Sequence, residues 1–118
     1  MSKRFASVRL EHIAESIIAI ERYLGQRGER DLGSFPMLRD AIERRLEIIG
    51  EAVSALRRDF PGVLAEEPLI DWAQIAGMRV VLAHAYDNVD PTVLLQTIRN
   101  DLPPLKEAVK RLLVRHSS

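Results

Sequence analysis

Residues 36–58 read PMLRDAIERRLEIIGEAVSALRR, and this stretch decides the fold class. Its apolar residues recur every three or four positions; they are Leu38, Ile42, Leu46, Ile49, Val53 and Leu56. A helix turns by about 100° per residue, so this spacing places them on one face. Phe60-Pro61-Gly62 ends the pattern. The stretch therefore predicts an amphipathic helix with one buried face.

The preceding segment carries the same kind of spacing. Residues 5–24 predict a first helix, with apolar positions three to five apart. The sequence GQRG over residues 25–28 should stop it, because glycine readily ends a helix. Residues 25–36 are then predicted to form a loop.

A third helix is predicted after a connector at residues 61–70. Asp71 can cap this helix, and Gln74 stands three positions later, as in a capping box. Ile70 and Ile75 can pack together across the cap. The helix should run to about residue 84 or 86.

The last helical stretch covers residues 92–115. Asp90 followed by Pro91 is typical of an N-cap and a first helical residue. Pro103-Pro104 must kink this helix or split it in two. No alternating strand pattern occurs. We therefore predict an all-α fold, an antiparallel up-and-down bundle of four helices, or five if the prolines split the last.

Length and composition limit the function classes. The chain has 118 residues, which predicts one domain over residues 1–118. Seventeen basic residues balance seventeen acidic ones, which argues against binding of nucleic acid through the net charge of the chain. The absence of cysteine excludes disulfide scaffolds, thiolate metal sites and cysteine nucleophiles. No apolar run approaches the roughly 20 residues of a membrane span, and no signal peptide core follows the N-terminus, so we expect a cytoplasmic protein without membrane contact.

Pairs of adjacent apolar residues make the apolar faces of the predicted helices wider than contact with a single neighbouring helix requires. They are Ile17-Ile18, Ile48-Ile49, Leu94-Leu95 and Leu112-Leu113. One interpretation is a thick core, and the other is packing against a second copy of the chain. We predict a homodimer.

The stretch that could carry chemistry is residues 71–86, DWAQIAGMRVVLAHAY. After Gln74 its only polar side chains are Arg79, His84 and Tyr86. Arginine can hold a phosphate and stabilise charge that develops on its oxygens, and histidine can transfer protons near neutral pH. Tyrosine can stack on a base, donate a hydrogen bond or accept a covalent modification.

These groups suit cleavage of RNA by its own 2′-hydroxyl, which needs a base, an acid and a charge stabiliser. One histidine supplies only one of the two proton-transfer groups. A two-fold dimer would bring two sets of Arg79, His84 and Tyr86 into one cleft. From spacing alone, the alternative is structural: His84 as a packed or helix-capping residue, Arg79 as an ion-paired residue and Tyr86 at the edge of the core.

The other candidate residues carry weaker signals. Glu51 stands where the apolar stripe of its helix meets polar residues, as a solvated carboxylate or as a support that orients Arg79 or His84. His12 is expected on the surface, and His116 in a frayed tail. The basic residues near the C-terminus predict a solvated face or a face toward RNA; they are Lys110, Arg111 and Arg115. No Glu-x-x-His pair occurs, so a di-iron bundle site is unsupported. We expect neither a metal nor a cofactor.

The spacing Arg79-x4-His84-x-Tyr86 resembles the signature of the HEPN superfamily, and within it the HepT-like toxins of toxin–antitoxin pairs. The surrounding block, residues 70–86, resembles the family's central segment. Two further segments resemble its second and last helices; they are Ile49-Gly50-Glu51-Ala52 and Leu102-Pro103-Pro104-Leu105. The resemblance covers nearly the whole chain.

This resemblance implies a dimeric all-α bundle and, for many members, metal-independent endoribonuclease activity on RNA. By position, His84 would be the catalytic residue, Arg79 the contact to phosphate or transition state, and Tyr86 the third member. It also implies a partner, a minimal nucleotidyltransferase antitoxin of the MntA type. Such a partner can silence the toxin by attaching AMP to the motif tyrosine, here Tyr86, which would place negative charge where an RNA phosphate should bind.

One position departs from the family pattern. Many relatives carry a polar residue after the motif arginine, often asparagine, whereas this chain has Val80. Valine makes no hydrogen bond to RNA or to a neighbouring side chain. The alternative function is therefore a non-catalytic module of the same fold that binds nucleotide or a partner protein. A third hypothesis is a structural interaction protein in which Arg79, His84 and Tyr86 only form the end of a helix.

Overall fold

The computed structural model describes residues 3–83 and 90–116, and these two ranges are almost entirely helical. The elements in chain order are α1 (Lys3–Arg27), the 3-10 turn η1 (Glu29–Leu32), α2 (Pro36–Asp59), α3 (Pro61–Leu64), α4 (Trp72–Ala83), α5 (Pro91–Asn100) and α6 (Leu102–His116). The two ranges contain no strand. The predicted all-α fold class is confirmed.

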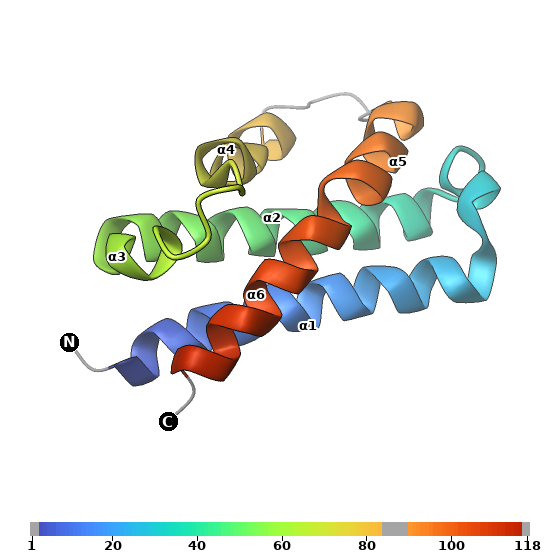
Figure 1. Ribbon diagram of the computed structural model, residues 1–118. Helices are drawn as coiled ribbons and strands as arrows, with labels where there is room; N and C mark the ends of the chain where they lie inside the picture. Colours follow the sequence, from blue (N-terminus) through green and yellow to red (C-terminus); the bar gives the residue numbers. More distant parts are fainter. Residues whose placement is uncertain (1–2, 84–89, 117–118) are drawn as a thin grey trace.

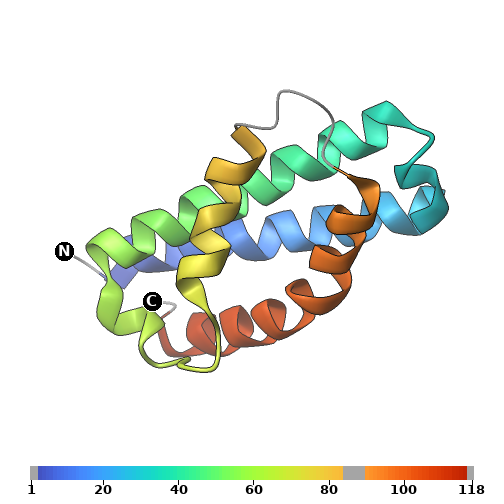
Figure 2. The same ribbon diagram turned by 90° about the horizontal axis from the view of Figure 1, so that it is seen from above.

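The long helices run back and forth along the molecule, which measures 44 × 28 × 22 Å (Figure 1). α1 and α2 lie antiparallel and form the centre of the bundle. Figure 2 shows α4 crossing over α2, and α6 contacts α1. The arrangement follows the predicted up-and-down order, with α3 as an added single turn after α2.

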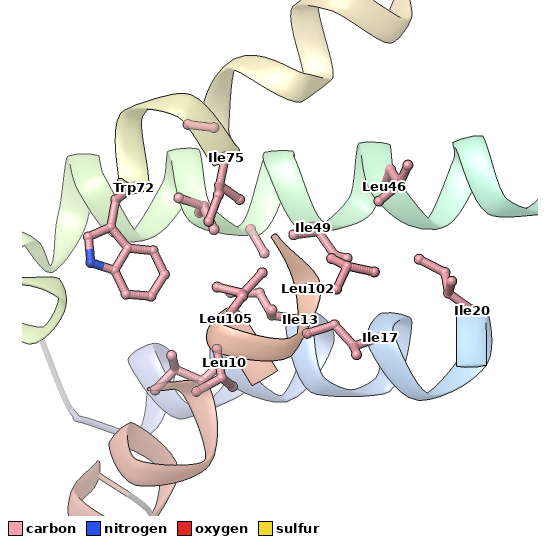
Figure 3. Packing of buried hydrophobic residues seen from close by; sticks show 14 of the residues in the cluster. Leu10, Ile13, Ile17, Ile20, Leu46, Ile49, Trp72, Ile75, Leu102 and Leu105 are labelled. Carbon is pink, nitrogen blue, oxygen red and sulfur yellow. The ribbon is translucent and has the colours of Figure 1, made fainter. Parts of the chain in front are cut away.

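The core lies between α1, α2, α4 and α6. All six apolar positions predicted for residues 36–58 are at most 5% exposed. Figure 3 shows residues of α1, α2 and α6 converging on one cluster; among those labelled are Leu10, Ile13, Ile17, Ile49, Leu102 and Leu105. The 3.6-residue period of the sequence therefore identified the buried face correctly.

Two ion pairs join helices that are distant in sequence. Lys106 of α6 lies 3.0 Å from the carboxylate of Glu21 on α1. Arg99 of α5 pairs with Glu29 of η1. Both pairs are exposed, so they contribute little to the stability of the fold.

The first helix is longer than the sequence predicts. It continues through Gly25 to Arg27, and η1 occupies part of the predicted loop. Gly28 ends α1 with a φ of 87°, a value that glycine adopts without strain. Its N–H donates to the carbonyl of Leu24 at 2.6 Å. The second glycine of the GQRG sequence, and not the first, is therefore the stop.

Both predicted helix caps are present. The N–H of Gln74 donates to Asp71 Oδ1 at 3.1 Å, and that of Thr92 donates to Asp90 Oδ1 at 2.8 Å. Each bond satisfies a backbone donor that the first turn of a helix leaves without a partner. Pro91 occupies the first position of α5, as predicted.

The two prolines split the last helix. α5 ends at Asn100 and α6 begins at Leu102, with Asp101 between them. Pro103 and Pro104 lie in the first turn of α6, where a missing N–H removes no bond within the helix. The split version of the predicted bundle is therefore the one observed.

The adjacent apolar pairs do not all lie inside the core. Ile17 is buried, whereas its neighbour Ile18 is 46% exposed. Ile48, Leu95 and Leu113 are half-buried. The wide stripes thus reach the surface of this chain, and the predicted homodimer stays a prediction. No helix in the described ranges is long and apolar enough to cross a membrane.

Candidate active site

α4 carries the first residue of the Arg79-x4-His84-x-Tyr86 motif. The helix packs against α2 and buries Trp72, Ile75 and Ala76. Arg79 follows Trp72 by seven positions and Ile75 by four, so its backbone position lies on the same side of α4 as these two. The side chain of Arg79 lies outside the described part of the chain.

The other two motif residues belong to a stretch outside the described ranges. His84 directly follows Ala83, the last residue of α4, and Tyr86 comes two positions later. Residues 84–89 are not described, and neither is the side chain of Val80. That Arg79, His84 and Tyr86 meet in one site therefore stays a prediction.

Glu51, the predicted supporting carboxylate, lies on α2, the helix against which α4 packs. Its side chain is exposed, between the buried residues Gly50 and Ala52. Among the described residues it forms no hydrogen bond or ion pair. Its support of Arg79 or His84 stays a prediction.

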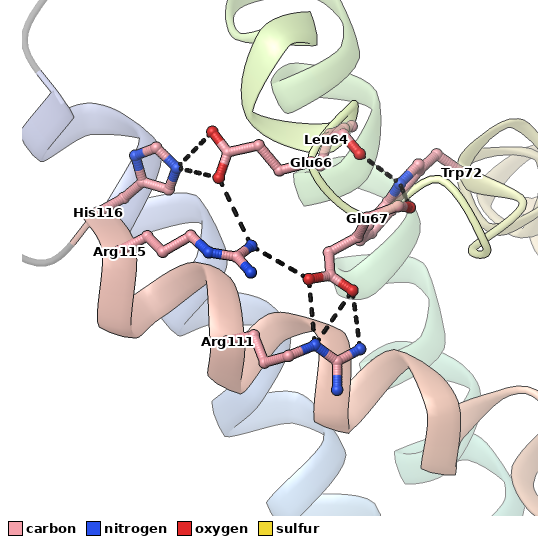
Figure 4. Close-up of polar contacts among 7 residues, drawn as sticks. All are labelled: Leu64, Glu66, Glu67, Trp72, Arg111, Arg115 and His116. Atoms are coloured by element: carbon pink, nitrogen blue, oxygen red, sulfur yellow. Dashed lines mark hydrogen bonds and ion pairs between the residues drawn. The ribbon is translucent and has the colours of Figure 1, made fainter.

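Trp72 fixes the start of α4, a function that sequence reasoning missed. Its side chain is 9% exposed, and its indole Nε1 donates to the carbonyl oxygens of Leu64 at 3.0 Å and Glu67 at 3.1 Å (Figure 4). A buried indole N–H requires such a partner. Trp72 thereby joins the helix of the motif to α3 and to residues 65–71. We call residues 65–71 the connector from here on, because α3 occupies the start of the segment predicted as a connector.

Glu67 ties the same connector to α6. Its carboxylate accepts from Arg111 Nη2 at 2.7 Å and Arg111 Nε at 3.1 and 3.2 Å, and from Arg115 Nη1 at 3.2 Å (Figure 4). The side chain of Glu67 is 10% exposed. The hydrogen bonds from Arg111, and then those from Arg115, hold the pKa of Glu67 below its ordinary value.

The basic face of α6 is correspondingly occupied. Arg111 and Arg115 bind Glu67, and Lys110 lies 3.5 Å from Glu107 on its own helix. These contacts favour a structural function over contact with RNA.

The prediction that His116 lies in a frayed tail is wrong. It is the last residue of α6, and its side chain is 11% exposed. Its Nε2 lies 3.0 Å from both carboxylate oxygens of Glu66 (Figure 4). The two adjacent carboxylates of the connector hold the end of the helix in place. His12, by contrast, is exposed on α1, as predicted.

No three histidine, aspartate or glutamate side chains in residues 3–83 and 90–116 form a group that could hold a metal ion.

We expect Glu67→Gln to lower stability at neutral pH and to lose this effect in acid. The folded pKa of Glu67 lies below the unfolded one, so its contribution is complete above the unfolded value of about 4.3. It disappears as the pH falls through the folded pKa. Urea unfolding of both proteins at pH 7 and near pH 3 measures the difference.

The matched control for Glu67 is Glu107→Gln, which removes an exposed carboxylate paired only within α6. It should change stability little at either pH. An equal destabilisation by Glu67→Gln at both pH values would contradict the assignment, because the loss would then not depend on the charge.

Fold and motif together define a class, an all-α helical-bundle domain with polar motif residues on and directly after one helix. A family model described as "Ribonuclease HepT-like" matches residues 13–112 of the chain. The chain belongs to this HepT-like ribonuclease family. The resemblance stated from its motif is therefore confirmed.

Two relatives match over nearly their whole length. The chain is 38% identical over 110 residues to "Probable ribonuclease HepT" of Thermococcus cleftensis. The match covers 93% of this chain and 97% of that protein. It is 40% identical over 105 residues to a "Putative RNase" of Caldanaerobacter subterraneus subsp. tengcongensis, covering 88% and 90%.

A third relative is a longer protein. The chain is 34% identical over 111 residues to the Methanocaldococcus jannaschii protein named "Gamma-glutamylcyclotransferase and putative RNase". The match covers 94% of this chain but spans only 49% of that protein. No solved structure matches the chain.

Proposed function

We propose that this chain is the toxin of a toxin–antitoxin pair and a metal-independent endoribonuclease. One observation carries the proposal: the Arg79-x4-His84-x-Tyr86 motif begins on α4 of a chain that belongs to the HepT-like ribonuclease family. The names of two relatives that the chain covers to 90% or more, both of which include ribonuclease or RNase, support the same activity.

The reaction uses the RNA's own 2′-hydroxyl as the nucleophile. A base removes its proton, the 2′-oxygen bonds to the adjacent phosphorus, and the bond from phosphorus to the 5′-oxygen breaks. An acid protonates the departing 5′-oxygen. The products are a 2′,3′-cyclic phosphate and a free 5′-hydroxyl, so atoms and charge balance without a metal.

Each of the three motif residues has its own function in this reaction. His84 transfers a proton, because imidazole does so near neutral pH. Arg79 binds the phosphate and stabilises the charge that develops on its oxygens. Tyr86 is the third member and contacts the nucleotide, by stacking on a base or by donating a hydrogen bond. A homodimer brings two sets into one cleft, so that one His84 acts as the base and the other as the acid.

The experiment is RNA cleavage in excess chelator. We expect the wild-type protein to cut a single-stranded RNA or a transfer RNA and to leave 2′,3′-cyclic phosphate ends. An RNA with a 2′-deoxy group at the cleaved position should not be cut there, because the nucleophile is missing. Cleavage of that substitute at the same position would contradict the mechanism, and no cleavage of any RNA would contradict the activity.

The proposed partner is a minimal nucleotidyltransferase of the MntA type that silences the toxin through Tyr86. The phenol oxygen of Tyr86 gives up its proton to solvent and bonds to the α-phosphorus of ATP. The bond from that phosphorus to the oxygen bridging to the β-phosphate breaks, and pyrophosphate leaves. The added AMP places a phosphate where the RNA phosphate would bind. With the partner and ATP, intact mass should rise by one adenylyl group in the wild type and not in Tyr86→Phe. An equal gain in both would assign the modification elsewhere.

Val80 favours a second candidate function, a non-catalytic module of the same fold. A valine beside Arg79 offers no hydrogen bond to RNA or to a neighbouring side chain. Such a module would bind nucleotide or the partner protein without cutting RNA. Tight RNA binding with no cleavage, in the wild type and in His84→Ala alike, would favour this candidate.

A further inference from the structure

Two charged side chains are buried in the described part of the chain, those of Glu67 and Arg39. The Glu67 carboxylate accepts hydrogen bonds from Arg111 and Arg115. Arg39, on α2, is 7% exposed, yet its Nε is enclosed and donates no hydrogen bond. Within residues 3–83 and 90–116 it also forms no ion pair. Arg39 is therefore a buried cation that no described carboxylate neutralises.

An arginine in this position is unfavourable for the fold itself. A guanidinium does not lose its proton in proteins, so burial leaves its full charge in place. A charge that leaves water without a partner destabilises the folded state, whereas an apolar side chain of similar size would not. The packing of α2 alone therefore does not account for Arg39, but an anion that binds to it would.

The two carboxylates nearest to Arg39 along α2 do not supply this anion. Asp40 is exposed, because one step along a helix turns its side chain by about 100° from that of Arg39. Glu43 is half-buried one turn further on. Burial, and then the charge of Asp40, raise the pKa of Glu43, although the charge of Arg39 lowers it. A carboxylate paired with Arg39 would have a lowered pKa, so the arginine remains open to a ligand.

The first turn of α2 adds positive charge next to Arg39. Long side chains on a helix point toward its N-terminus, so the side chain of Arg39 should extend over this turn. No side chain caps the turn, and it contains no acidic residue. The partial positive charge of the helix N-terminus therefore adds to that of the guanidinium, and the two together favour a phosphate group.

Arg39 lies on the side of α2 against which α4 packs. It precedes Arg57 by 18 positions, which is about five helical turns, so the two residues lie on the same side of the helix. Arg57 lines a hollow together with Trp72, the first residue of α4. The same side of α2 thus carries the unpaired arginine and the helix of the motif.

The helix that follows Tyr86 also begins near α2. A Cβ on Gly33 would lie 4.0 Å from Pro91 Cγ, so the first residue of α5 lies beside the loop that leads into α2. Along the chain, Arg39 lies between Gly33 and Arg57, the contact points of α5 and α4. An RNA strand bound at the motif therefore has Arg39 in its neighbourhood.

We propose that Arg39 binds a phosphate group of the RNA strand, in addition to the phosphate assigned to Arg79. Its planar guanidinium can donate two parallel hydrogen bonds to the oxygens of one phosphate. Arg39 is a positioning residue and takes no part in the proton transfers. That the phosphate belongs to RNA rests on the proposed function, whereas the binding of a phosphate group at Arg39 does not.

Binding of a labelled single-stranded RNA to His84→Ala tests this contact without cleavage. Adding Arg39→Met should weaken binding by about 10-fold, the effect of one hydrogen bond between charged groups. The slope of log affinity against log salt concentration should become shallower by about 0.7, the value for one phosphate of a single strand. The matched control is Arg44→Met, since Arg44 is exposed on α2 and paired with Glu47. Equal affinities and slopes for the two variants, or no RNA binding at all, would overturn the proposal.

Thermal unfolding separates this function from a structural one. In buffer without phosphate, Arg39→Met should unfold at the wild-type temperature or above it, because methionine fills the space without a buried charge. Inorganic phosphate should raise the melting temperature of the wild type and not that of Arg39→Met. A lower melting temperature of Arg39→Met, together with unchanged RNA binding, would overturn the proposal and make Arg39 a structural residue.

The nuclease and the phosphate contact can fail separately. RNA binding that depends on Arg39, without cleavage by the wild type, would contradict the nuclease activity and support the contact. Cleavage by the wild type, with RNA binding that does not depend on Arg39, would overturn only the contact. Stabilisation by inorganic phosphate in that second case would assign Arg39 to a free anion and not to RNA.

Discussion

Changing His84 to alanine should abolish RNA cleavage while the protein stays folded. A positioned acid or base contributes about 10²- to 10⁴-fold to such a reaction, so the rate should fall by at least about 100-fold. If two copies of His84 serve one cleft, a single substitution removes both the base and the acid. The measurement is the rate of cleavage of an end-labelled RNA in excess chelator, with helical content followed by circular dichroism.

His12→Ala is the matched control for this experiment. His12 is another single histidine of the chain, and it lies exposed on α1. We expect its replacement to leave the cleavage rate within about two-fold of wild type. Equal rates for wild type and His84→Ala would remove His84 from the mechanism. Loss of both cleavage and helical content in His84→Ala would show that its function is structural.

The fold was predictable wherever the signal is local. Capping depends on a residue and its neighbours two or three positions away, so Asp71 and Asp90 were correctly identified as caps. Pro103-Pro104 had to break a helix, because proline lacks the N–H that the interior of a helix requires. The buried stripe of α2 followed from a period that every residue of the helix shares.

Contacts between distant segments were not predictable. Nothing in the sequence relates Glu67 to Arg111, which lies 44 positions later. The pair forms because the bundle brings the connector beside α6. For the same reason His116 was expected in a frayed tail, although Glu66 holds its side chain. A chain end has no local signal that tells whether a distant carboxylate will meet it.

The candidate site was found by its motif and not by its geometry. Arg79, His84 and Tyr86 are separated by a fixed spacing that a family resemblance can recognise. The anchor of their helix was missed, because Trp72 appears in the sequence only as one more apolar residue. Its function depends on the carbonyl oxygens of Leu64 and Glu67, which every residue type supplies.

Changing Trp72 to alanine should destabilise the protein by about 3–5 kcal/mol. The substitution leaves a cavity in the core and removes both indole hydrogen bonds. For a chain of this length we expect a fall in the melting temperature of about 10–20 °C. Trp72 is the only tryptophan, so unfolding in urea must be followed by circular dichroism and not by indole fluorescence.

Trp72→Phe separates the contribution of the indole hydrogen bonds to stability from that of apolar burial. Phenylalanine keeps most of the buried apolar volume but cannot donate to the carbonyl oxygens of Leu64 and Glu67. Each of these acceptors keeps a backbone donor, Glu67 N–H for Leu64 and Ile70 N–H for Glu67. The loss of the two indole hydrogen bonds, at about 0.5–1.5 kcal/mol each, should therefore cost less than the alanine substitution. Equal costs for the two substitutions would show that packing contributes nothing beyond the two hydrogen bonds, which would contradict the place of Trp72 in the core. Because the indole bonds fix the start of α4, Trp72→Phe should also slow RNA cleavage, by less than His84→Ala does, through the position of Arg79.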